Sequence, residues 1–151
     1  MKATPAAVAV LRQATALRPR RKKASDGLLP SAAHLVQNSK SDHNTGLAVD
    51  ITHDPAHGID AAEIFEQFKK DRRVSYLIYN GQIWSRAKAA QGNRKYDGSN
   101  KHIKHLHISI IEEFANDDSP WFWWMNQPNK VNKLVAKTIP LAKKQAYKEK
   151  D

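Results

Sequence analysis

The stretch SDHNTGLAVDITHD, residues 41–54, decides the fold and contains the first candidate site residues. Apolar side chains alternate along residues 46–51, and this period of two predicts a strand with one face in the core. Asp50 belongs to the opposite face of that strand. A turn containing Gly46 precedes the strand and allows His43 to fold back toward Asp50. The stretch therefore predicts a histidine and a carboxylate side by side on a sheet.

A second stretch, HIKHLHIS at residues 102–109, brings three more histidines together. We expect a strand over 104–111, in which His105, His107 and Ser109 share one face. The alternate residues are apolar and are expected to face the core: Leu106, Ile108 and Ile110. If this strand lies beside the first one, its two imidazoles converge on the aspartate.

Two imidazoles and one carboxylate predict a catalytic zinc site. Zinc takes nitrogen ligands at about 2.0–2.1 Å and carboxylate oxygens at about 2.0–2.2 Å, and three protein ligands leave the fourth tetrahedral position for water. The chain has no cysteine, so a metal must be held by His, Asp or Glu. A zinc ion lowers the pKa of its water toward roughly 7 and polarises a carbonyl, which suits amide hydrolysis. A nearby side chain must then carry protons to the leaving amine.

These residues resemble the signature of a known family. Five positions match the pattern S-x-H-x-x-G-x-A-x-D of the D-Ala-D-Ala carboxypeptidase and endolysin metallopeptidases, which share a fold with the hedgehog N-terminal domain: Ser41, His43, Gly46, Ala48 and Asp50. The pair His105 and His107 matches the closing H-x-H of that family. The wider likeness, over about residues 18–110, is similar to the peptidase domains of phage endolysins. Five signature positions in register with a downstream H-x-H form a specific motif.

The resemblance implies an α+β fold of the hedgehog/DD-peptidase type, a small antiparallel sheet with helices packed on one side. It also implies a Zn²⁺ ion bound by His43, Asp50 and His107. His105 would lie beside the metal and handle protons or stabilise the transition state.

One position departs from the family pattern. Many relatives have an acid three residues before the last histidine ligand, where this chain has Lys104. A related branch, the murein endopeptidases, instead shows H-x-x-H-x-H, which His102, His105 and His107 reproduce. We therefore expect His105 to be the catalytic base or electrostatic residue, with His102 as a further catalytic candidate near the substrate.

The implied reaction is hydrolysis of an amide bond in the murein stem peptide or its cross-link, at L-Ala-D-Glu, at a D-Ala-containing cross-link or at terminal D-Ala. A cation is then needed for the substrate carboxylate, and Lys40 is nearest to the motif. We expect Ser41 to be a hydrogen-bonding group there and not a nucleophile, because no Gly-x-Ser-x-Gly elbow surrounds it. The other candidate cations are Arg18, Arg20 and Arg21.

The formal net charge of +10 lies at the two ends of the chain. Residues 1–23 hold seven Lys or Arg and no acid, and residues 129–151 hold seven Lys against two acids. Basic ends favour encounter with anionic cell-wall polymers or other polyanions. The centre is close to neutral, which disfavours a nucleic-acid partner, and the C-terminal end is most simply a solvated tail.

The remaining pattern predicts one zinc peptidase domain over residues 1–128, with its motif core at 18–110, and a Lys-rich tail over 129–151. Several local elements are expected: a helix from Thr4-Pro5 that ends before Pro19, a helix that starts at Asp60, a hairpin VSYLIY-NG-QIWS over 74–85, a polar loop over 86–101 and a short aromatic helix WFWWM after Ser119-Pro120.

No segment is expected to cross a membrane, and the short apolar run near the N-terminus does not predict a signal peptide. We expect a monomer that is made in the cytoplasm and acts at the cell wall, after holin-type release or as part of a virion. The alternative function is a catalytically inactive zinc- or cell-wall-binding module of the same fold, for which Lys104 is the reason. A metal-dependent nuclease, suggested by the charge and the clustered histidines, is a weaker alternative.

Overall fold

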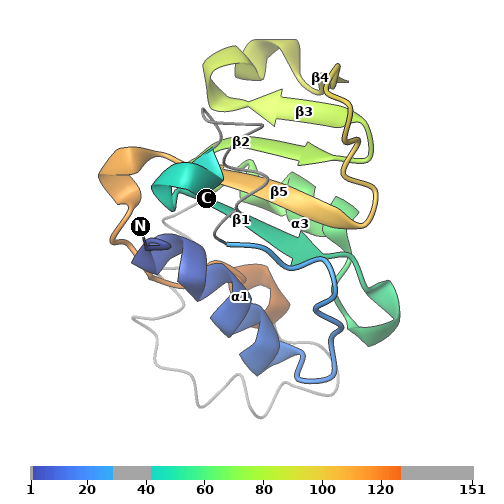
Figure 1. The fold of residues 1–151 in the computed structure, drawn as a ribbon, viewed down its shortest axis with the longest axis vertical. Helices are drawn as coiled ribbons and strands as arrows, with labels where there is room; N and C mark the ends of the chain where they lie inside the picture. Colours follow the sequence, from blue (N-terminus) through green and yellow to red (C-terminus); the bar gives the residue numbers. More distant parts are fainter. Residues whose placement is uncertain (1, 29–41, 127–151) are drawn as a thin grey trace.

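The computed structural model describes residues 2–28 and 42–126, which form an α+β fold around one antiparallel sheet. The sheet has five strands in the order β1-β5-β2-β3-β4 (Figure 1). The strands are β1 (Ala48–Thr52), β2 (Val74–Tyr79), β3 (Gln82–Ser85), β4 (Arg94–Lys95) and β5 (His105–Ile110). The helices are α1 (Pro5–Leu17) and α3 (Ala61–Phe68), with 3-10 turns η1 (Asp42–Thr45), η2 (Pro55–His57), η3 (Arg86–Gln91), η4 (Glu112–Phe114) and η5 (Trp123–Asn126).

Helix α1 begins and ends where its sequence predicts. The Thr4 hydroxyl accepts a hydrogen bond from the Ala7 amide at 3.4 Å, and Pro5 occupies the first helical turn, where its missing N–H costs nothing. The helix ends at Leu17, before Pro19.

Helix α3 also begins at the predicted cap. The Asp60 carboxylate accepts hydrogen bonds from the amides of Ala62 and Glu63 at 3.0 and 3.4 Å. The Glu63 carboxylate accepts a hydrogen bond from the Trp124 indole at 2.7 Å. This acid therefore links the first turn of α3 to the C-terminal part of the described chain.

The predicted hairpin connects β2 and β3. Asn80 and Gly81 both have positive φ, 50° and 77°, as a two-residue hairpin turn of this type requires. Leu77 pairs with Trp84 across the hairpin, and both side chains are buried. The turn residues thus set the register that places the apolar side chains together.

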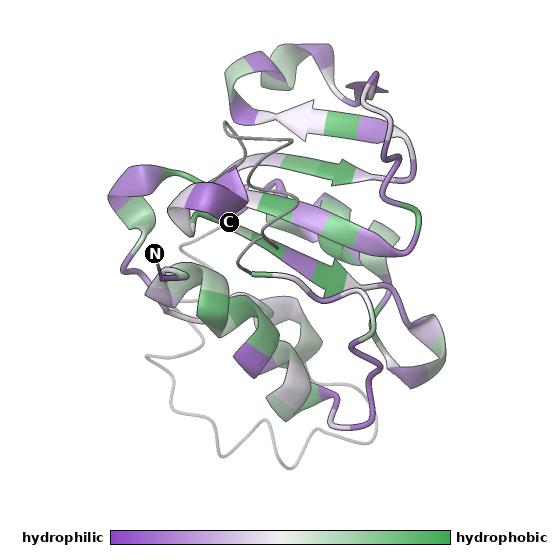
Figure 2. Ribbon diagram, viewed as in Figure 1, coloured by the Kyte–Doolittle hydropathy of each residue, from purple (hydrophilic) through white to green (hydrophobic). Residues whose placement is uncertain are grey.

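The core lies on one face of the sheet. Helix α1 packs against β1, and α3 packs against β2 and β5 (Figure 1). Apolar and polar residues alternate along β1 and β5 (Figure 2). Both helices share one apolar cluster with the core face of the strands, which includes Val49, Ile51, Leu77, Leu106 and Ile108. The opposite face of β1 and β5 carries the polar side chains.

Two predicted elements differ from the structure. Residues 86–101 contain the 3-10 turn η3 and the strand β4, whose two residues pair with β3 through Gln82↔Lys95 and Ile83↔Arg94. A two-residue strand is too short to show a periodic pattern, so the loop prediction was wrong there.

The aromatic run is also not the predicted helix. Trp121 and Phe122 are buried in irregular chain, and only Trp123–Asn126 form a 3-10 turn. The buried Arg73 explains this, because its guanidinium donates to the carbonyl oxygens of Asp117, Ser119 and Pro120 at 2.8–3.0 Å. The same guanidinium lies 3.5 Å from the centre of the Trp121 ring. These carbonyl oxygens therefore accept hydrogen bonds from a side chain and not from the backbone amides of a helix.

No helix within the two described ranges is long and apolar enough to cross a membrane. The predicted tail over residues 129–151 lies outside the described residues.

Candidate metal centre

Strands β1 and β5 are neighbours, and their register places Asp50 directly opposite His107. The Asp50 Oδ1 atom lies 3.2 Å from His107 Nδ1, and its Oδ2 atom lies 3.3 Å from His43 Nε2. The three side chains offer donor atoms that all lie within 4.8 Å of one another. This group, called here the donor triad, could hold a metal ion.

His43 reaches the triad through the turn that its sequence predicts. It lies in η1, and Gly46 follows with φ of 75°. A Cβ at Gly46 would lie 2.2 Å from the Lys2 carbonyl oxygen, so only glycine fits where the N-terminus crosses this turn. The glycine thereby lets the chain enter β1 with His43 above Asp50.

Hydrogen bonds to the far nitrogens orient both imidazoles. His43 Nδ1 lies 2.9 Å from the Leu28 carbonyl oxygen, and His107 Nε2 lies 2.8 Å from the Ser109 hydroxyl. A carbonyl oxygen only accepts, so the ring proton of His43 is on Nδ1. In each ring the nitrogen nearest Asp50 is the one left to bind a cation, as in metal sites whose histidines donate their other N–H to a fixed acceptor.

The electrostatics of the triad favour a cation between its members. Burial would raise the pKa of Asp50, but hydrogen bonds and charge from His107 and His43 hold it well below its usual range. Burial would lower the pKa of His43, but Asp50 outweighs this effect and leaves that pKa raised. Because an imidazole lone pair and a carboxylate oxygen repel, a proton or a metal ion must lie between them.

An edge segment, residues 21–28, covers β1 beside the triad. Gly27 exchanges backbone hydrogen bonds with Asp50 at 2.8 and 3.1 Å. A Cβ at Gly27 would lie 3.1 Å from Asp50 Oδ2, which is tighter than nine in ten real Cβ contacts. A larger residue at this position would therefore require the carboxylate to shift by a few tenths of an ångström.

The Arg21 side chain holds this edge segment in place. Its guanidinium makes two bonds to the Asp26 carboxylate at 2.8 and 3.1 Å, and Asp26 accepts from the Thr52 amide and hydroxyl. Arg21 is buried, so it is a structural residue and not the substrate cation that was one of the predicted options.

His105 and His102 lie next to the triad, as the sequence predicts. The Nε2 atom of His105 is 3.7 Å from Asp50 Oδ2. The ring of His102 lies with its centre 4.9 Å from that of His105 and 5.6 Å from that of His107. Burial lowers the pKa of both rings, and the charge of neighbouring histidines lowers it further. The pKa of His102 falls to about 4. Both imidazoles are neutral at pH 7 and can accept a proton.

His102 has a backbone conformation that non-glycine residues rarely adopt, with φ of 57°. Its Nδ1 atom lies 2.7 Å from the Asn100 carbonyl oxygen, which fixes the ring proton on Nδ1 and leaves Nε2 as the basic nitrogen. Such strained positions persist where the surrounding structure imposes them, and they cluster at functional sites.

Tyr76 on β2 completes the wall of the site. Its ring stacks on the His107 imidazole, with centres 5.4 Å apart and planes at 18°. Burial and the nearby Asp42 carboxylate raise the pKa of Tyr76 to about 12. Tyr76 is thus a neutral phenol that fixes the plane of a triad ring.

Several candidates fall elsewhere. Lys40 and Ser41, the predicted substrate-binding residues, lie outside the described residues. His53 accepts a hydrogen bond from the Ala61 amide. The Nδ1 atom of His57 lies 2.8 Å from the Asp54 carboxylate.

Sequence comparison places this donor set within a family. The profile of the family described as "VldE, C-terminal domain" matches residues 2–107. The chain belongs to the VldE C-terminal domain family. The matched region contains all three triad residues and ends at His107, the last of them. No curated protein and no solved structure gave a significant match.

Sequence reasoning missed four residues that shape the triad: Gly27, Leu28, Tyr76 and Ser109. The strand pattern placed Ser109 on the correct face without a role. Gly27 lies within residues 18–110, which resemble endolysin peptidase domains, but glycine has no side-chain donor atom that would mark it as a site residue. Leu28 acts through its backbone, which side-chain patterns do not reveal.

Proposed function

We propose that this protein is a zinc-dependent peptidase with a hedgehog/DD-peptidase-like fold, which hydrolyses an amide bond of the murein stem peptide or its cross-link. The observation that carries the proposal is the donor triad, with two neutral histidines beside it. Two imidazoles and one carboxylate suit Zn²⁺, and three ligands are the pattern of catalytic zinc sites. The substrate class is supported by the signature that Gly46, Ala48 and Asp50 share with endolysin peptidases.

The chain's own residues divide the remaining tasks. A zinc ion held by the triad would activate water and polarise the substrate carbonyl. His105 is close enough to the triad to take a proton from the attacking water, and it is neutral at pH 7. His102 Nε2 is the second basic nitrogen and serves the leaving amine. The Leu28 carbonyl keeps the His43 ring in its binding tautomer, and the Ser109 hydroxyl orients the His107 ring.

The test is clearing of purified peptidoglycan by the zinc-loaded protein, with released peptides identified by mass. We expect clearing that is lost in the EDTA-treated form and in His107→Ala and His105→Ala, with new peptide amino ends. His57→Ala is the matched control, because His57 lies outside the donor triad. Folded, zinc-loaded protein that releases no peptide from several wall types would contradict the peptidase proposal and favour a catalytically inactive zinc- or wall-binding module.

A further inference from the structure

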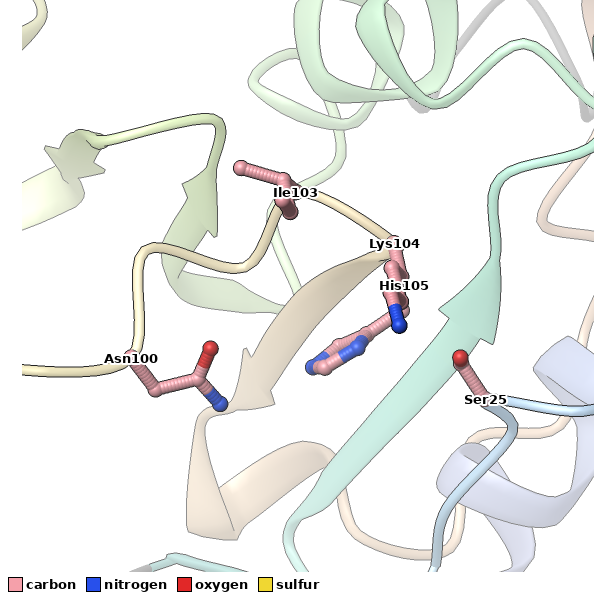
Figure 3. A pocket seen from close by; sticks show the side chains of 5 residues that line it. All are labelled: Ser25, Asn100, Ile103, Lys104 and His105. Carbon is pink, nitrogen blue, oxygen red and sulfur yellow. The ribbon is translucent and has the colours of Figure 1, made fainter.

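An open pocket of about 400 Å³ adjoins the donor triad. It is lined by Ser25, Asn100, Ile103, Lys104 and His105. Asn100 and Ser25 lie on opposite sides of the His105 imidazole (Figure 3). Because His105 belongs both to this pocket and to the surroundings of Asp50, a molecule in the pocket lies next to the proposed reaction centre.

Apart from the His105 imidazole, each polar side chain on the pocket wall can donate a hydrogen bond to a ligand. The Asn100 side-chain oxygen already accepts from the His102 amide at 3.0 Å, so its NH₂ group is the part left to bind a ligand. Lys104 offers an ammonium, which has three donors and no acceptor. Ser25 adds a hydroxyl group. A wall of donors with one positive charge complements an anionic acceptor.

The Lys104 ammonium has no ionic partner in the described part of the chain. No carboxylate of residues 2–28 or 42–126 lies within 4.0 Å of it, whereas Arg21, Arg73 and Lys69 are all paired. The adjacent Ile103 is 61% exposed and gives the pocket an apolar rim. An unpaired cation beside an apolar side chain suits a carboxylate carried on a small organic residue.

We propose that Lys104 and Asn100 bind a substrate carboxylate, so that the enzyme prefers a peptide with a free carboxylate close to the scissile amide. This inference rests on the proposed peptidase function and assigns the substrate cation to Lys104. The residue that replaces the acid of related enzymes is then a specificity residue. An ammonium cannot replace a basic carboxylate, but it binds the acidic group of a stem peptide.

The test compares two murein stem pentapeptides with their amides. In one pair the α-carboxylate of D-Glu is free or amidated, and in the other the C-terminal carboxylate is free or amidated. The zinc-loaded full chain is assayed for kcat/KM on all four, with Lys104→Met and Lys104→Arg. Lys88→Met is the matched control, because Lys88 is exposed in η3 and does not line the pocket.

We expect the wild type to prefer one free carboxylate at least about tenfold, since charge-assisted bonds reach that size. Lys104→Met should reduce the preference for the free carboxylate over its amide to within about twofold, by a change in KM. Lys104→Arg and Lys88→Met should keep the preference. Turnover by Lys104→Met with an unchanged preference would overturn the inference.

If the wild type cleaves none of the peptides, the proposed function fails. Equilibrium binding of the same peptides then tests separately whether the pocket binds a carboxylate. Binding that needs the carboxylate and is lost in Lys104→Met keeps the carboxylate site. Equal binding of the acid and the amide would overturn the proposed carboxylate site.

Discussion

The Nδ1 atom of His43 lies 2.9 Å from the carbonyl oxygen of Leu28. The ring proton is therefore fixed on Nδ1, and Nε2 carries a second proton only when the imidazole is charged. Burial opposes that charge, but Asp50 outweighs burial and raises the pKa of His43 above 6.5. A metal ion at Nε2 must displace this proton.

Zinc affinity should therefore fall as the pH is lowered through the pKa of His43, by up to about tenfold per pH unit for this one proton. Competition with a chromophoric zinc chelator between pH 8 and pH 5.5 measures the slope. His43→Gln should bind zinc more weakly and show a slope smaller by about one proton. An unchanged slope in this variant would mean that another group releases the proton.

Gly27→Ala should weaken zinc binding, because the new Cβ would lie 3.1 Å from Asp50 Oδ2 and push the carboxylate out of place. The matched control is Gly92→Ala. Gly92 has φ of 64° and ψ of −150°, a conformation essentially confined to glycine, and nothing lies within 4 Å of its Cβ position, so the control should lose about 1–3 kcal/mol of stability and keep its zinc affinity. Calorimetric zinc titration and urea unfolding together separate the two effects. Equal zinc affinities for the two variants would contradict a close fit at Gly27.

Ser109→Ala should lower zinc affinity about 10–100-fold, the usual effect of removing a group that orients a ligand histidine. The Ser109 hydroxyl is buried and lies 2.8 Å from His107 Nε2. Ser85→Ala on β3 is the control, since its hydroxyl bonds Arg94 and not a triad residue. The prediction fails if both serine variants bind zinc like the wild type.

His102 should make the zinc-free protein less stable in mild acid. Its folded pKa is about 4, so below pH 6.5 the unfolded chain takes up a proton that the folded chain does not. The free energy of unfolding therefore falls as the pH drops from about 6.5 to 4, by up to about 3 kcal/mol from this group. His102→Asn removes the titration and tolerates the positive φ. Urea unfolding at pH 7 and pH 4 should show a smaller loss in the variant, and parallel losses would rule out this contribution.

Arg73→Met should lower the free energy of unfolding by about 3–5 kcal/mol, because it leaves the buried Asp71 carboxylate without its partner. Arg73→Lys should also be destabilising, since an ammonium cannot replace the planar fork that bonds Asp71 and three carbonyls. Denaturant midpoints test both variants. A Lys variant as stable as the wild type would show that only the charge matters.

The sequence predicts the parts of the site that depend on strand periodicity. Alternation placed Asp50, His105 and His107 on one face, and the adjacency of β1 and β5 then brought them together. The hairpin turn and both helix caps were also predictable, because Asn-Gly, Thr-Pro and Asp act through local chemistry.

The parts that could not be predicted depend on contacts between distant segments. The irregular path of residues 117–122 follows from the buried Arg73, whose partners lie more than forty positions away. The role of Gly27 follows from how closely the edge segment passes Asp50. Neither contact leaves a periodic pattern in the chain.

The pairing of β1 with β5 has a consequence during synthesis. His43 and Asp50 leave the ribosome together, but His107 follows 57 residues after Asp50. A nascent chain therefore carries only two of the three donors until β5 has been made and has inserted between β1 and β2. If the triad binds a metal ion, tight capture is then a late event, because the third donor arrives only with the strand that completes this part of the sheet.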